Sequence, residues 1–177
     1  MQNRIDGEAL RLVMRHVPSP VTIVTVAGED ELRGITIGSF TSTSLRPPLI
    51  SFNVSREARI HEVLTAADRF AVHVLADDQA PLSDHFATPD LTGAEQFQDV
   101  TYSVDEHGTP ILSGALAVML CARHAVYDAG DHSIMLGRVV ELLDTDEDGF
   151  PLVYFDRAYR RVGKEAQPTL FDPVIDE

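Results

Sequence analysis

Residues 34–55, GITIGSFTSTSLRPPLISFNVS, decide which kind of fold this chain can form. Two runs rich in β-branched residues enclose a hydroxyl-rich run, and two prolines at 47–48 interrupt the stretch. β-Branched and aromatic residues favour strands, whereas proline marks a turn or the edge of a strand. We therefore expect one strand to begin at Ile35 and to continue through residues 38–44, and the next strand to cover residues 49–54.

Strand patterns also flank this stretch on both sides. They cover residues 21–26, 70–76, 115–127, 133–143 and 152–162, with a short hairpin inside residues 101–112. Helices are predicted after a capping Asp6 and over residues 57–67 and 80–87, while residues 88–100 are predicted as a loop. Strands dominate and do not alternate strictly with helices, which predicts a mostly antiparallel barrel or sandwich instead of a doubly wound parallel sheet.

The length and charge of the chain limit the number of domains and the kinds of partner that we expect. It has 177 residues, with 14 Lys and Arg against 28 Asp and Glu, and so a formal net charge of −14. One domain is expected at this length, formed by residues 1–163, with residues 164–177 as an acidic C-terminal tail. An acidic chain repels nucleic-acid phosphates and anionic membranes, so neither is an expected partner. No apolar run approaches the ~18 residues of a membrane span and no signal-peptide pattern is present, so a cytoplasmic location is expected.

Several kinds of catalytic site lack the residues they need. Cys121, the single cysteine, lies in the apolar run 115–122, so we interpret it as a buried structural residue and not as a nucleophile. The histidines show none of the spacings of a zinc site, so no metal is expected. Neither a dinucleotide-binding glycine motif, nor a P-loop, nor a G-x-S-x-G nucleophile elbow is present.

Three polar clusters remain as candidates for ligand binding. Six of the nine residues 36–44 carry a hydroxyl, so a turn here would gather N–H groups and hydroxyls around a phosphate; the alternative is a half-exposed strand. Residues 53–56 with Arg59 suit a phosphate or a polar ring edge, or else form an ordinary helix cap with solvated arginines. His132, oriented by Asp131, is either a donor to a ligand or a surface residue of a turn.

Taken in order, five segments resemble the flavin reductase family. They are VTIVT at 21–25, the stretch at 34–55, RFAVHVLADDQAPLSDHFA at 69–87, GDHSIMLGRVVEL at 130–142 and PLVYFDRAYRRV at 151–162. The resemblance spans Leu10 to Arg161 and implies a mainly β fold, the antiparallel FMN-binding split β-barrel with a few short helices. It also implies an NAD(P)H-dependent flavin reductase that transfers a hydride to FMN or FAD, forms a homodimer and supplies reduced flavin to a partner monooxygenase.

The resemblance assigns a role to each matching position. The segment that wraps the flavin phosphate and ribityl chain corresponds to Thr36, Ile37, Gly38, Ser39, Phe40, Ser42 and Ser44. The strand end that meets the isoalloxazine and phosphate corresponds to Asn53, Val54, Ser55 and Arg56, with Arg59 one helical turn further on. The strand that passes the flavin contributes His73 and Val74, although relatives commonly have Asn in place of His73. Asp131 and His132 match a turn on the nicotinamide side, where His132 is the catalytic candidate, and Tyr154 and Tyr159 close the site.

Other functions remain open at this point. A split barrel that retains its flavin and oxidises its own substrate would keep its yellow colour through desalting, and so would a non-catalytic flavin-binding protein. A ligand-binding barrel without flavin would not quench flavin fluorescence. The sequence does not distinguish FMN from FAD, or NADH from NADPH, as the reductase's substrates.

Overall fold

The computed structural model describes residues 5–143 and 149–163 of the chain. The predicted acidic turn over residues 144–149 lies outside these ranges except for its last residue, and the 164–177 tail lies outside them completely. No helix of the described residues is long and apolar enough to cross a membrane.

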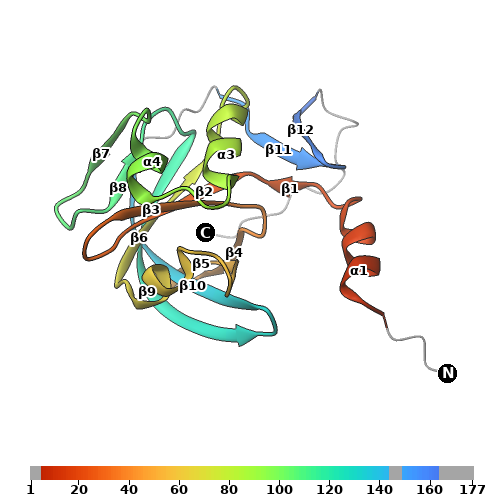
Figure 1. Cartoon of the computed structure of the whole chain (residues 1–177), viewed down its shortest axis with the longest axis horizontal. Coiled ribbons are helices and arrows are strands. Elements are labelled where there is room, and N and C mark those ends of the chain that lie inside the picture. The colour runs from red at the N-terminus through yellow and green to blue at the C-terminus, as the bar shows by residue number, and fades with distance from the viewer. Residues whose placement is uncertain (1–4, 144–148, 164–177) are drawn as a thin grey trace.

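A seven-stranded antiparallel sheet forms the body of the protein (Figure 1). Its strands, in spatial order, are β3 (Leu32–Ile37), β2 (Thr22–Ala27), β6 (Arg69–Val74), β9 (Ala117–Ala129), β10 (His132–Leu143), β5 (Pro48–Ser55) and β4 (Thr41–Leu45). The two edge strands, β3 and β4, follow each other in the chain with only residues 38–40 between them. Because a residue spans at most about 3.6 Å, this short crossover forces the sheet to curl until its edges approach each other.

The curled sheet is an open barrel, as expected for the split-barrel class. Strand pairing among the described residues runs from β3 to β4 through the other five strands, and no ladder joins the two edges directly. We call the opening between β3 and the β5–β4 side of the sheet the seam; β3 contacts β5 there but pairs with neither strand. The prediction of one strand from Ile35 through residue 44 is wrong, because the chain leaves the sheet after Ile37 and re-enters it at the opposite edge. Strand propensity continues across the break, and only the tertiary register reveals it.

Two small sheets and four helices complete the described fold. The small sheets pair β1 (Ser19–Pro20) with β11 (Leu152–Phe155) and β12 (Ala158–Arg161), and β7 (Tyr102–Val104) with β8 (Pro110–Leu112). The helices are α1 (Gly7–Met14), α2 (His61–Ala66), α3 (Ala80–Ala87) and α4 (Gly93–Phe97). The cap at Asp6, the helix over residues 80–87 and the hairpin inside 101–112 are confirmed.

Beyond shifts of one or two residues at strand ends, three further elements differ from the predictions. Helix α2 begins at His61, four residues later than expected. The loop predicted over residues 88–100 contains α4, which begins with a capping box in which Thr92 and Glu95 satisfy each other's amides. The single strand predicted over 152–162 is the β11–β12 hairpin, whose turn residues Asp156 and Arg157 both have positive φ.

The core occupies both faces of the large sheet. On one face, Phe52 and Phe70 meet edge to face with 5.6 Å between ring centroids, and Met135 is fully buried in the same cluster. On the other face, α3 and α4 contribute Phe86 and Phe97 to a second cluster. Burying one such side chain stabilises the fold by about 1.5–3 kcal/mol, so these contacts fix α3 and α4 against β2 and β3. Cys121 is buried, as predicted, and burial raises the pKa of its thiol to about 12.

A glycine in β10 permits close packing inside the barrel. A Cβ on Gly137 would lie 2.5 Å from Phe70 Cζ and 3.2 Å from Cys121 Cβ. We expect Gly137→Ala to lower the free energy of unfolding by about 1–3 kcal/mol, because an overpacked core has to shift its neighbours. Denaturant unfolding measures this effect, and Gly7→Ala is the matched control because a Cβ there meets nothing within 4 Å. Equal stability of the two variants would contradict the packing argument.

Candidate functional site

A groove of about 510 Å³ crosses the seam, and we call it the central groove. It is lined by residues 35–39, Asn53, Ser55, Ala129, His132 and Ile134. Residues 35–39 come from β3 and the crossover, whereas the others come from β5 and the β9–β10 hairpin. The central groove thus brings together seven of the predicted site residues: Thr36, Ile37, Gly38, Ser39, Asn53, Ser55 and His132.

Strand register explains why these side chains meet. His132 pairs with Ser55 and Ile134 pairs with Asn53, so alternation along two antiparallel strands turns all four to one face. Across the seam, Ser39 Oγ accepts a hydrogen bond of 2.9 Å from the Asn53 amide. This bond fixes the crossover against β5 and holds the two walls of the groove together.

The crossover leaves backbone donors without partners. Among the described residues, the amides of Gly38, Ser39 and Phe40 have no hydrogen-bond acceptor. Unpaired N–H groups at adjacent positions attract an anionic ligand group such as a phosphate. These backbone N–H groups, and not the hydroxyls, support the predicted phosphate-binding role of this segment.

The predicted convergence of hydroxyls in residues 36–44 is wrong. Thr36 Oγ1 donates to the Ser83 carbonyl at 2.7 Å, whereas Thr43 Oγ1 donates to Ser51 Oγ at 2.9 Å. The break in the strand separates these groups, because it sends one part of the segment to β3 and the other to β4. Ser42 and Ser44 lie on β4 and do not line the central groove.

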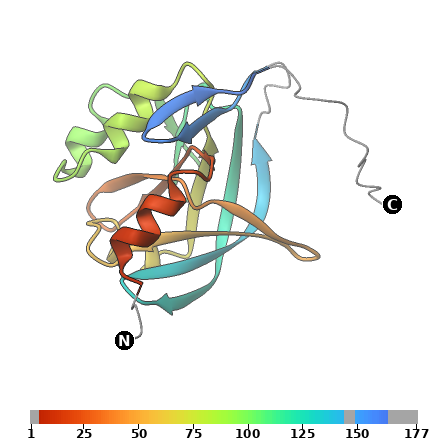
Figure 2. The same ribbon diagram turned by 90° about the vertical axis from the view of Figure 1, so that its right-hand side faces the viewer.

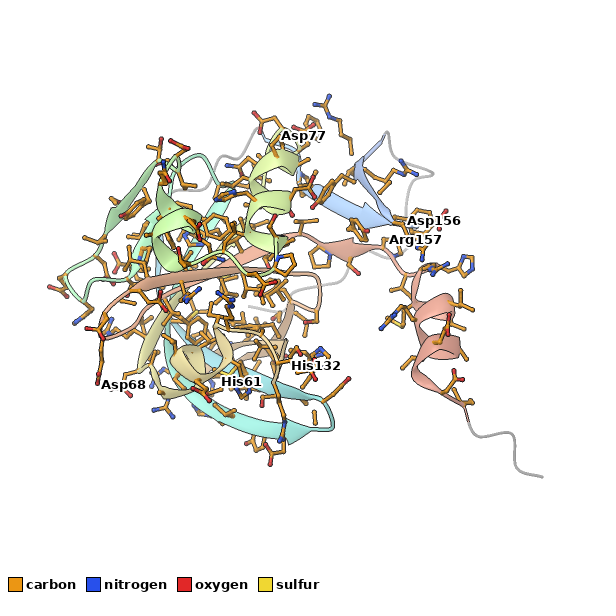
Figure 3. All side chains as sticks on the ribbon, in the orientation of Figure 1. His61, Asp68, Asp77, His132, Asp156 and Arg157 are labelled. Carbon is orange, nitrogen blue, oxygen red and sulfur yellow. The ribbon has the colours of Figure 1, made fainter. Side chains whose placement is uncertain are left out.

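The β9–β10 turn contributes a histidine, His132, to the lining of the groove; Figure 3 labels this side chain. His132 Nδ1 lies 2.7 Å from Asp131 Oδ1, so the Nδ1–H donates to the carboxylate and Nε2 remains available to a ligand. This hydrogen bond holds the pKa of the Asp131 carboxyl below its usual value. Arg56 supports the same turn: its amide donates to the Asp131 carbonyl at 3.0 Å, and its guanidinium pairs with Asp128 at 2.6 Å. Arg56 therefore holds the turn and does not line the groove.

A second pocket, of about 290 Å³, opens beside the central groove and shares residues 36–38 with it. We call it the tyrosine pocket, because Tyr154 and Tyr159 form one wall with 5.4 Å between ring centroids. The Tyr159 hydroxyl lies 2.9 Å from both Ser83 Oγ and Asp84 Oδ1 on α3, so it donates to the carboxylate and accepts from the serine. Burial, together with the Asp84 charge, raises the pKa of Tyr159.

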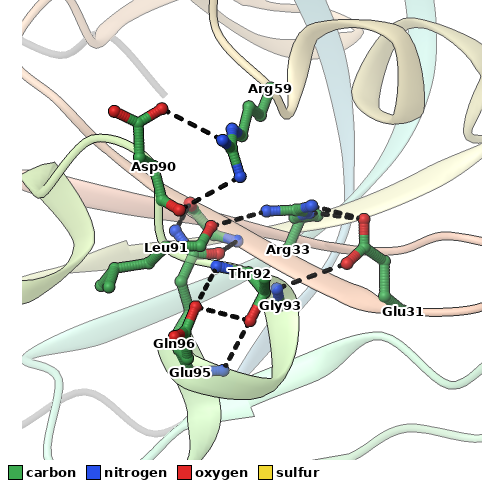
Figure 4. Close-up of polar contacts among 10 residues, drawn as sticks. Glu31, Arg33, Arg59, Asp90, Leu91, Thr92, Gly93, Glu95 and Gln96 are labelled. Carbon is green, nitrogen blue, oxygen red and sulfur yellow. Dashed lines mark hydrogen bonds and ion pairs between the residues drawn. The ribbon is translucent and has the colours of Figure 1, made fainter.

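A third pocket, of about 310 Å³, shares Ile35 and Thr36 with the central groove. Arg59 lies at its rim and donates to both the carbonyl and the carboxylate of Asp90, each at 3.1 Å (Figure 4). Arg33 lies deeper, where it pairs with Glu31 at 2.6 Å and donates to the Leu91 carbonyl at 2.9 Å. Arg59 is thus placed near the groove but paired with a carboxylate.

His73 lines none of the three pockets described above, contrary to its predicted contact with flavin. It is completely buried; its Nδ1–H donates to the Ile23 carbonyl and its Nε2 accepts from the Leu112 amide, both at 3.0 Å. Burial lowers its pKa to about 4, so the ring is neutral. Both ring nitrogens serve the core, which leaves neither for a ligand.

Other predicted residues also face the core or lie beyond the groove. The Val54 side chain is buried, and Phe40 packs against the same core cluster. Val74 and Asp131 do not line any of the three pockets. Conversely, no pattern in the sequence pointed to Ser83 and Asp84, because their place in a pocket depends on how α3 packs against the sheet. No group of metal-ligating side chains occurs within residues 5–143 and 149–163.

Comparison with known proteins identifies the family. The model of the flavin reductase like domain matches residues 14–163. The chain is 44% identical over 137 residues to the NADH-dependent FAD reductase of Streptomyces globisporus, covering 76% of this chain and 75% of that protein. It is 39% identical over 155 residues to the reductase component of 4-hydroxyphenylacetate 3-monooxygenase from Thermus thermophilus, covering 88% and 96%.

A solved structure agrees with these sequence matches. The NADH:FAD oxidoreductase of Streptomyces globisporus, in complex with NAD and FAD fragments, superposes with a TM-score of 0.83 at 38% identity, covering 92% of this chain and 96% of that one. The split-barrel topology, the groove across the seam and the match over residues 14–163 all lead to one conclusion: the chain belongs to the flavin reductase-like family.

Proposed function

We propose that the protein transfers a hydride from NADH or NADPH to FMN or FAD and supplies the reduced flavin to a separate monooxygenase component. The central groove is the observation that carries this proposal, since its lining combines apolar side chains with unpaired crossover amides and a turn histidine. Relatives named as reductases of monooxygenase systems support the partner role.

The residues of the groove fit a flavin. Ile35, Ile37 and Ile134 provide an apolar surface for a planar ring, while Asn53 and Ser55 provide polar groups for its edge. The amides of residues 38–40 suit the phosphate. We keep Asn53, Ser55 and the 36–39 segment as flavin-binding residues and His132 as the residue on the nicotinamide side.

The chemistry itself belongs to the two bound nucleotides, which exchange a hydride when their rings are held in contact. The chain's task is to position both rings and to exclude water, and a near-attack arrangement can supply most of the acceleration. This agrees with a groove in which His132 is the one titratable side chain among the described lining residues. His132 Nε2 is left as an acceptor because Nδ1–H donates to Asp131, and it can orient the nicotinamide by accepting from the N–H of its carboxamide.

Steady-state oxidation of NADH and of NADPH, each with FMN and with FAD, tests the proposal. We expect at least one combination to run far above the rate without enzyme. A rate equal to the background in all four combinations would refute the reductase function. Protein that stays yellow after desalting would favour a flavin-retaining oxidoreductase on the same fold.

We also propose a homodimer, supported by the exposed apolar face of α1. The helix stands apart from the large sheet in Figure 1 and lies at the front of the view in Figure 2, and none of its residues is buried. Leu10, Val13 and Met14 are each at least 50% exposed. Apolar side chains clustered on one exposed helix face are typical of a surface covered by another subunit.

The dimer proposal predicts that a charge on α1 dissociates the protein. We expect Val13→Glu to shift the mass from dimer to monomer in light scattering at micromolar concentration, because burying a carboxylate in an apolar interface is costly. Glu8→Gln on the same helix is the control and should leave the mass unchanged. A wild-type protein that is monomeric at the same concentration would contradict the dimer.

Two further proposals concern the residue range of the reductase domain and the compartment of the cell in which it acts. We propose residues 1–163 as the reductase unit, a range that contains the family match at 14–163. Because NADH is supplied in the cytoplasm, we propose that the enzyme acts there.

A further inference from the structure

The tyrosine pocket continues the central groove along a shared boundary. Thr36, Ile37 and Gly38 line both, so a ligand can extend from one into the other past the crossover. The unpaired amides of residues 38–40 start at this boundary. A ligand with a redox ring in the central groove would therefore place its phosphates at the amides and its far end in the tyrosine pocket.

The walls of the tyrosine pocket suit an aromatic base and a sugar. Tyr154 is 42% exposed and is braced edge to face by Tyr159, so it offers a ring surface on which a base can stack. Pro20, Val21 and Ala87 add apolar surface. The Tyr159 hydroxyl is anchored to Ser83 and Asp84, which fixes the position of the ring.

The polar groups of the pocket suit a ribose and oppose a phosphate. Asp84 is exposed, and only its Oδ1 bonds to Tyr159, so Oδ2 is available to accept from neighbouring hydroxyls. No lysine or arginine occurs among the described residues that line the pocket. A carboxylate accepts well from a ribose diol and repels a phosphate on the same sugar.

Three arginines lie near the tyrosine pocket but do not line it. Arg11, Arg15 and Arg157 line a neighbouring pocket that shares only Ser19 and Tyr154 with the tyrosine pocket. Asp84 is held by Tyr159 and does not line that neighbouring pocket. Tyr154 thus stands between the arginines and the sugar site at Asp84.

We propose that the tyrosine pocket binds the adenosine end of a dinucleotide, with Asp84 accepting hydrogen bonds from the ribose hydroxyls. The inference rests on the proposed function, because it takes the central groove as the place of the redox ring. Adenosine occurs in both FAD and NADH, and the experiment distinguishes these two sources. In either case Asp84 is the residue that recognises the sugar.

Binding of adenine nucleotides without a redox ring tests the site directly. Calorimetry with AMP and with adenosine 2′,5′-bisphosphate should show that the wild-type protein binds AMP about tenfold more tightly, because the 2′-phosphate meets the Asp84 carboxylate. Asp84→Asn should remove most of this preference. Asp78→Asn is the matched control, because it removes an exposed carboxylate just before α3 that does not line the tyrosine pocket. This variant should retain the preference for AMP.

Kinetics then identify the source of the adenosine. If it belongs to NADH, Asp84→Asn raises kcat/KM for NADPH relative to NADH by about tenfold. If it belongs to FAD, Asp84→Asn raises the KM for FAD several-fold and leaves the KM for FMN, which lacks adenosine, unchanged. Either result supports the proposal.

Three results would overturn the proposal. The first is that Asp84→Asn changes neither AMP binding nor kinetics, and the second is that Asp84→Asn weakens the reaction equally with FMN and with FAD. The third is that the preference for AMP over the 2′-phosphorylated nucleotide changes in Arg157→Gln and not in Asp84→Asn. Failure of the proposed function looks different, because the wild-type protein would then bind AMP without oxidising NADH above background.

Discussion

Replacing His73 by alanine is expected to lower the free energy of unfolding by about 3–5 kcal/mol. The change removes a fully buried ring and leaves a cavity between β6, β2 and β8. It also leaves the Ile23 carbonyl and the Leu112 amide without their partner. Denaturant unfolding at neutral pH measures the loss, and His124→Ala, on β9, is the control. A loss below about 1 kcal/mol would contradict the structural role of His73.

The same histidine gives the fold a predictable pH dependence. Its pKa is about 4 in the folded protein and about 6.5 when unfolded, so below pH 6.5 the unfolded state binds a proton that the folded state excludes. The contribution is therefore complete above about pH 6.5 and is lost as the pH falls to about 4. The difference of pKa corresponds to about 3 kcal/mol of stability.

His73→Asn separates the titration from the packing. An amide can donate to the Ile23 carbonyl and accept from the Leu112 amide, but it does not titrate. We expect this variant to be more stable than His73→Ala at neutral pH and to lose less stability than the wild type between pH 6.5 and 4. An acid dependence as steep as that of the wild type would assign the titration to other groups.

The elements that were predicted well are those whose pattern is local. β2 is a run of β-branched residues, β6 is a short, mostly apolar segment with two valines, and α3 shows helical spacing after a proline in its first turn. The β9–β10 hairpin was predicted because two long strand patterns flank Asp128–Asp131. In each case the residues that define the element are neighbours in the chain.

The features that were missed depend on distant residues. The break between β3 and β4 arises because β3 pairs with β2 whereas β4 pairs with β5. No pattern in the Ser- and Thr-rich run indicates this break. The β11–β12 turn uses Asp156 and Arg157 with positive φ, where glycine would have been the usual indication. His73 lies in an apolar strand, and only the positions of Ile23 and Leu112 decide between a ligand contact and a core contact.

The candidate site shows the same difference between local patterns and features that depend on distant residues. Asn53, Ser55 and His132 were predicted from matching segments, and the antiparallel register of β5 and β10 brings them to one face. Asp84 could not be predicted, because its place depends on α3 packing beside β3 and on a tyrosine from the last hairpin. The sequence therefore indicated one pocket and not its continuation.

Replacing His132 by alanine is expected to lower kcat/KM for NADH by about 10–100-fold, the largest effect on activity that we predict. The variant removes the Nε2 acceptor from the lining of the central groove while leaving the apolar walls and the amides of residues 38–40 in place. The KM for flavin should therefore change little. His107→Ala is the matched control, since His107 also lies at a hairpin turn beside a carboxylate, Glu106, but outside the central groove.

The role of Asp131 follows from its hydrogen bond to His132. Because that bond keeps the pKa of the carboxyl below its usual value, Asp131 stays ionised throughout the neutral range and holds Nδ1–H in one tautomer. Asp131→Asn should cost less than His132→Ala, since an amide oxygen can still accept from Nδ1 while the charge is lost. In the double variant the aspartate change should add little, because residue 131 acts through His132. Two independent, additive losses would instead show that Asp131 contacts the nicotinamide nucleotide itself.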